Sequence, residues 1–107
     1  MRNDRPQSEV YREAAMRWCD ADAAARLLED TKASVFAQRC MLVEGSVAKA
    51  EMVTRASTEW QSHLERIVRA RTAANKARIE MEFTKMQAWE RQSQEAYERQ
   101  EMRMTAS

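Results

Sequence analysis

The chain has 107 residues, of which 44% are hydrophobic and 33% charged, and its formal net charge is +1. This composition indicates a single folded domain over residues 1–107 and argues against a disordered chain. It provides no general attraction to nucleic acid or to membranes, and no apolar run approaches the roughly 18 residues that span a bilayer. One proline, Pro6, and one glycine, Gly45, leave two long stretches rich in good helix formers, so we expect an all-α fold.

The first predicted helix covers about residues 8–44, with Ser8 as its N-cap and Gly45 as a left-handed C-cap. Apolar residues recur every seven positions in two rows, which is typical of a helix-packing seam. The rows are Ala14, Ala21, Leu28, Val35 and Leu42, and Tyr11, Trp18 and Ala25. The second row fails at Lys32 and Arg39, where the apolar surface drifts to Phe36 and Val43. Such drift favours a bundle helix over a strict coiled coil.

After Gly45 we expect a short helix at about 47–56, capped by Ser46, and a long helix at about 58–100. The boundary is predicted at Ser57-Thr58, where Thr58 and Gln61 have the spacing of a capping box. One unbroken helix from residue 47 is the alternative. Residues 1–7 and 101–107 are expected to fray at the two ends.

The apolar face of the long helix is wider than one neighbour requires. One row repeats every seven residues, at Trp60, Ile67, Ala74, Met81 and Ala88. Five more residues widen this face to nearly half of the helix, namely Leu64, Val68, Ile79, Phe83 and Met86. We therefore expect this helix to touch two neighbours, in a long helical hairpin that dimerises into a bundle. The predicted packing anchors are Trp18, Leu28, Val35, Trp60, Ile67 and Met81.

Polar residues interrupt the same face at Arg71, Asn75, Arg78, Glu82 and Lys85. Arg78 and Glu82 are four residues apart and are placed to pair. Two interpretations stay open for these polar residues. They set the register of the bundle, or their long stems reach outward at its edge.

The best candidate surface lies in residues 66–78, which hold five basic residues and no acid. Arg66, Arg69 and Lys76 are expected to project away from the apolar face, toward an acidic protein or nucleic-acid phosphates. The aromatic residues do not alternate with these cations, so base stacking is not indicated. The alternative to a binding surface is a solvated face, or a face that pairs within a dimer with the acidic residues of the first helix. Those acidic residues are Asp20, Asp22, Glu29 and Asp30.

No catalytic, cofactor or metal site is predicted. The single histidine, His63, and the two cysteines, Cys19 and Cys40, have no zinc-ligand spacing. On one helix the cysteines would lie about 31 Å apart, too far for a disulfide, so we expect two reduced thiols. The shortage of glycine excludes the usual phosphate-binding loops. With no signal peptide expected from the charged N-terminus, the sequence predicts a non-enzymatic cytoplasmic protein.

Two segments, Ala56–Glu65 and Trp89–Ala96, flank an Ala/Arg-rich helix, and together this region resembles small helical proteins of tailed phages and prophages. Such proteins are often encoded beside recombination and DNA-processing genes. The resemblance covers roughly residues 47–100 and implies a bacterial or phage accessory protein, with no catalytic residues to carry over. The chain is also similar in length to small secreted hairpins with a Trp-x-Gly turn. Its own turn, however, reads Val43-Glu44-Gly45, without the tryptophan.

These observations predict a small helical interaction protein that forms a homodimer and binds a protein partner. A nucleic-acid-associated factor that uses residues 66–78 is the alternative. No small-molecule substrate and no membrane association are expected.

Overall fold

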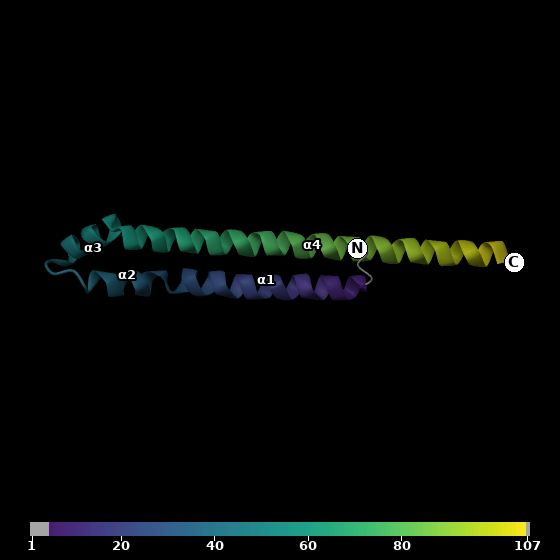
Figure 1. The fold of residues 1–107 in the computed structure, drawn as a ribbon, viewed down its shortest axis with the longest axis horizontal. Coiled ribbons are helices and arrows are strands. Elements are labelled where there is room, and N and C mark those ends of the chain that lie inside the picture. Colours follow the sequence, from purple (N-terminus) through teal and green to yellow (C-terminus); the bar gives the residue numbers. More distant parts are fainter. Residues whose placement is uncertain (1–4, 107) are drawn as a thin grey trace. The chain divides into compact units, whose positions relative to one another are not determined.

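The computed structural model describes residues 5–106, which form four helices and no strand (Figure 1). The helices are α1 (Gln7–Asp30), α2 (Lys32–Cys40), α3 (Val47–Ala56) and α4 (Thr58–Ala106). The predicted all-α hairpin, with a long last helix that pairs with an earlier one, is confirmed. The chain divides into two compact units, residues 19–75 and residues 1–18 with 76–107. Each unit is described by itself below.

The predicted first helix of 8–44 is wrong in its continuity, because it is broken at Thr31. The Thr31 hydroxyl donates to the Leu27 carbonyl at 2.6 Å, and the Thr31 N–H donates to the same oxygen at 3.1 Å. This back-bonding competes with the helical ladder and bends helices. The interruption is one residue long, since the Val35 N–H still donates to the Thr31 carbonyl at 2.9 Å.

The first half of the chain leaves its helix at Cys40, not at Gly45. The N–H groups of Leu42 and Val43 donate three residues back, to Arg39 and Cys40, both at 3.1 Å. Such tight turns close a helix end. Gly45 has a φ of 118° and lies within the turn, so the predicted C-cap role is wrong. Leu42, predicted in the buried row, lies beyond the helix and is 83% exposed.

The junction between α3 and α4 lies where the sequence predicts a boundary, so the unbroken alternative is wrong. Ser46 caps α3 by accepting from the Lys49 N–H at 3.2 Å, as expected. At the start of α4, Ser57 is the N-cap and accepts from the Trp60 N–H at 3.2 Å. The predicted capping box is wrong because Thr58 is already helical, and the Gln61 amide donates instead to the Arg55 carbonyl at 2.9 Å.

The ends of the helices differ slightly from expectation. α1 begins at Gln7, so Ser8 is inside the helix and not its N-cap. The Pro6 carbonyl accepts from the N–H groups of Glu9 at 3.0 Å and Val10 at 3.2 Å. α4 continues through residues 101–106, and residues 1–4 and 107 lie outside the described part of the chain, so the expected fraying stays a prediction.

In the unit of residues 19–75, the end of α1 and α2 lie alongside α3 and the start of α4 (Figure 1). Its buried residues are Ala25, Ala50, Thr54, Trp60 and Ala74. Trp60 is the one large side chain among them. An aromatic residue and small residues therefore share this seam.

In the unit of residues 1–18 and 76–107, the start of α1 packs against α4 through small residues. Ala14 and Thr84 are buried, and Ala88 is half-buried. The Thr84 hydroxyl donates to the Met81 carbonyl at 2.8 Å, so its polar group is satisfied inside α4. Small side chains let the backbones of two helices approach closely.

Candidate functional site

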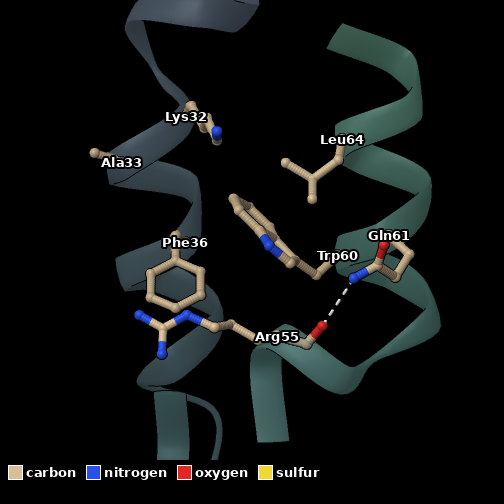
Figure 2. A pocket seen from close by; sticks show the side chains of 7 residues that line it. All are labelled: Lys32, Ala33, Phe36, Arg55, Trp60, Gln61 and Leu64. Atoms are coloured by element: carbon tan, nitrogen blue, oxygen red, sulfur yellow. Dashed lines mark hydrogen bonds between the residues drawn. The ribbon is translucent and has the colours of Figure 1, made fainter. Parts of the chain in front are cut away.

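An open pocket of about 440 Å³ lies within the unit of residues 19–75, between α2, α3 and α4 (Figure 2). Its wall consists of Phe36 from α2 and Trp60 and Leu64 from α4. Two cations lie at its rim, Lys32 from α2 and Arg55 from α3. Figure 2 shows the Trp60 indole reaching from α4 toward α2, with Lys32 directed to the same space. The pocket therefore combines an apolar wall with positive charge.

Aromatic contacts hold the pocket wall in place. The ring centroids of Phe36 and Trp60 are 5.0 Å apart and the rings are tilted by 59°, close to an edge-to-face arrangement. Trp60 also stacks on His63, with ring centroids 5.5 Å apart and an angle of 28° between the rings. The Arg55 guanidinium carbon lies 5.3 Å from the Phe36 ring centroid, within cation–π range. The same residue is anchored through its carbonyl by Gln61.

Arg71 forms the main polar connection between α4 and α1 in this unit. Its guanidinium donates to Glu29 at 2.6 and 2.8 Å and to Asp22 at 2.8 Å. Hydrogen bonds from Arg71 lower the pKa of both carboxyls, while partial burial opposes that shift. The same bonds raise the pKa of Arg71. For the polar residues that interrupt the apolar face, the sequence left two interpretations open. Arg71 agrees with a role in setting the register, since a bidentate ion pair restricts the register of two helices.

Asp22 and Glu29, two of the four acidic residues considered in α1, thus find a partner within one chain, whereas one interpretation of the sequence placed such pairing in a dimer. Asp22 also accepts from Arg26 at 3.0 Å. Arg78 pairs with Glu82 at 3.3 Å, as expected from their spacing. Arg71 and Arg78 are therefore neutralised within the basic stretch 66–78.

The structure places the three predicted surface cations on the outside of α4. Arg66 and Arg69 are exposed in one unit, and Lys76 is exposed in the other. Arg69 also pairs with Glu65 at 3.5 Å. Within the described chain, Arg66 and Lys76 make no ion pair. Fewer cations are thus free for phosphates than the sequence suggests.

Large apolar side chains remain exposed along the later part of α4. We call this row the α4 stripe, and its exposed fractions are 66% for Ile79, 53% for Phe83, 59% for Met86, 69% for Trp89 and 68% for Tyr97. Ile79 is two residues from the seam residue Met81, which is about 200° around a helix. Met86, Trp89 and Tyr97 line one shallow hollow. The second neighbour expected for this helix would lie here.

The predicted packing anchors differ in burial. Trp60 is 6% exposed. The other five, Trp18, Leu28, Val35, Ile67 and Met81, are half-buried. Leu64 is also half-buried, but Val68, Ile79, Phe83 and Met86 are exposed, so the broad apolar face is only partly covered within the chain.

The described residues hold no group of three or more His, Cys, Asp or Glu placed to bind a metal ion. Cys19 is exposed and Cys40 half-buried, and neither forms a disulfide. None of the described helices combines the length and apolar character needed to cross a bilayer.

Comparison with family models, curated proteins and solved structures finds no match to this chain.

Sequence reasoning missed the pocket. It noted Phe36 only as a drift of the apolar row, and it assigned no role to Lys32 or Arg55. These residues come from three helices, so no single helical period relates them. The one signal was the failure of the regular row at Lys32, where the surface turns toward Phe36.

Proposed function

We propose that this protein is a non-enzymatic helical interaction protein, which self-associates through the α4 stripe and acts by binding a protein partner. The observation that carries this proposal is the stripe itself. Monomeric soluble proteins rarely expose contiguous apolar patches larger than a few hundred Å². With about 150–250 Å² for each aromatic side chain, the exposed parts of the stripe sum to on the order of 700 Å².

This area suits a second copy of the chain. A standard interface buries about 800 Å² on each partner. The small core provides an independent reason, because the buried apolar residues among positions 5–106 are four alanines and Trp60. Small domains with so little buried surface usually need oligomerisation, disulfides or a bound metal for stability. The net charge of +1 adds little electrostatic repulsion between copies.

Nucleic-acid binding, the alternative, is less well supported. Three of the five basic residues in 66–78 are ion-paired within the chain, namely Arg69, Arg71 and Arg78. The resemblance to phage and prophage accessory proteins would place this protein in a bacterial or phage-infected cell. It stays a prediction, as does a cytoplasmic location.

Sedimentation equilibrium of the wild type and Phe83→Glu tests the proposal. We expect a wild-type dimer at micromolar concentration and at least about tenfold weaker association in the variant, because a charge would be buried in the interface. Ala73→Glu adds the same charge at an exposed position of α4 about 120° around the helix from Ile79, outside the stripe, and is expected to leave the dimer intact.

A folded wild-type monomer throughout the micromolar range would refute self-association. Equal dimers for wild type and Phe83→Glu would move the interface away from the stripe. A mobility-shift titration with duplex and single-stranded DNA, repeated at rising salt, tests the alternative. Saturable binding that Arg66→Gln and Lys76→Gln abolish would favour nucleic acid as the partner.

A further inference from the structure

The pocket between α2, α3 and α4 has an apolar wall that the chain itself leaves open. Phe36 and Leu64 are half-buried, and they flank the buried ring of Trp60. The volume of about 440 Å³ is in the range of small ligand pockets, which run from about 300 to 1,000 Å³. One large side chain of another molecule would contact all three of these residues.

The rim of the pocket is positive. Lys32 forms no ion pair with any described residue. Arg55 contacts Glu51 at 3.7 Å, a long and largely exposed ion pair of the kind that contributes little. Acidic side chains that approach Lys32 and Arg55 would therefore meet donors with little competition.

Trp60 supplies a third donor. Its indole N–H makes no hydrogen bond within residues 5–106 and is not sealed from solvent, so an acceptor that enters the pocket can reach it. Figure 2 draws the indole nitrogen on the ring edge toward Phe36. A ligand that brings an acceptor to this edge of the ring would therefore gain a hydrogen bond from Trp60.

We propose that this pocket binds an acidic peptide segment of a partner protein. A large apolar side chain of the peptide packs against Phe36 and Leu64, and acidic side chains near it accept hydrogen bonds from Lys32, Arg55 and the Trp60 indole. This inference rests on the proposed function, since it names the chemistry of the partner that the protein binds.

The same geometry favours a peptide over a nucleic acid. Base stacking needs an exposed aromatic face, whereas Trp60 is stacked on His63 and only 6% exposed. Two separate cations beside an apolar wall match a short peptide in which acidic residues flank an apolar side chain. A phosphate backbone would need a longer row of cations.

Fluorescence anisotropy with a labelled peptide tests this inference on the full chain. The probe alternates Phe and Leu with Glu and Asp, and its matched twin has Gln and Asn in place of the acids. We expect saturable binding of the acidic probe and at least about tenfold weaker binding of the twin, because charge-assisted hydrogen bonds are the stronger ones. Binding is also expected to weaken at higher salt.

The variants separate the pocket from general charge. Lys32→Gln and Arg55→Gln are each expected to weaken binding about tenfold. Trp60→Phe keeps an aromatic ring against Phe36 but removes the N–H, so it should weaken binding while circular dichroism shows unchanged helix content. Arg66→Gln removes an exposed cation outside the pocket and should have no effect.

Equal binding of the probe and its neutral twin would overturn the proposal, and so would a complete lack of saturable binding. An equal loss in Arg66→Gln would reduce it to a nonspecific charge effect. Competition by single-stranded oligothymidine, abolished by Lys32→Gln, would instead assign the pocket to nucleic acid. Failure here is distinct from failure of self-association, because Phe83→Glu lies outside the pocket and should leave probe binding unchanged.

Discussion

The two units of this protein use large and small side chains in opposite ways. In residues 19–75 the aromatic side chain of Trp60 lies inside the helix contact, against Phe36. In residues 1–18 and 76–107 the contact is made by small residues such as Ala14 and Thr84, and the large side chains of the α4 stripe face outward. The first unit thus buries its largest apolar side chain in its own packing, whereas the second leaves its large apolar side chains exposed.

The largest expected effect separates Trp60 from Trp89. Trp60→Ala should cost about 3–5 kcal/mol of stability, because it removes the largest buried side chain and leaves a cavity. Trp89 is 69% exposed, so Trp89→Ala should change the free energy of unfolding of the monomer little. Thermal and urea unfolding followed by circular dichroism measure both. Similar losses in the two variants would remove the contrast between the units.

The small-residue contact of the other unit predicts a second effect. Ala14 is 1% exposed, so Ala14→Leu should destabilise the protein by about 1–3 kcal/mol through overpacking. Ala96→Leu adds the same volume at an exposed position of α4 and should be close to neutral. Urea unfolding compares the two. Tolerance of leucine at position 14 would mean that the helices of this unit do not approach closely.

A smaller effect is expected at the start of α4. Ser57→Ala removes the hydroxyl that accepts from the Trp60 N–H, and loss of such an N-cap costs about 1 kcal/mol. Thr58→Ala changes the adjacent residue, which is already helical, and serves as the control. The thermal midpoint should fall in Ser57→Ala alone. A larger fall in Thr58→Ala would restore the capping box that the sequence suggests.

The smallest effect concerns the pH dependence of the Arg71 ion pairs. Arg71 lowers the pKa of Asp22 and Glu29, so its stabilisation is complete above their unfolded pKa values of about 3.9 and 4.3 and is lost as the pH falls further. The thermal midpoint of Arg71→Met should therefore lie below that of the wild type at pH 7. The difference should shrink toward pH 3.

Arg78→Met is the matched control for this titration, because its pair with Glu82 is exposed and lies within one helix. Its midpoint should stay close to that of the wild type at both pH values. A difference for Arg71→Met that stays constant from pH 7 to pH 3 would show that packing, and not the ion pairs, accounts for the effect.

Local features of the fold were accessible from the sequence. The bounds of α3 and the start of α4 follow from Ser46, Gly45 and the Ser57-Thr58 step, since caps and turns depend on neighbouring residues. The errors were also local. The sequence did not reveal that the Thr31 hydroxyl would bond back to Leu27, or that the helix would tighten and end at Cys40.

The candidate pocket was not accessible in the same way. Its cations, Lys32 and Arg55, are on different helices, and neither lies in a recognisable motif. The place of the Trp60 indole N–H at this pocket likewise becomes visible only when its surroundings are known. Sequence reasoning singled out Arg66, Arg69 and Lys76 instead, because a run of cations within one helix is what a linear pattern can show.

By itself, the sequence determined that the chain is helical, where its second half begins and breaks, and that the last helix carries more apolar surface than one neighbour covers. These properties depend on backbone preferences and on a 3.6-residue period, which act over a few residues. Only the tertiary structure decided that Trp60 is buried while Phe83 is exposed. It also decided that Arg71 meets Glu29 and Asp22, which lie 42 and 49 residues away. Such choices depend on the register between distant helices, because each helix offers several apolar rows and only packing selects one.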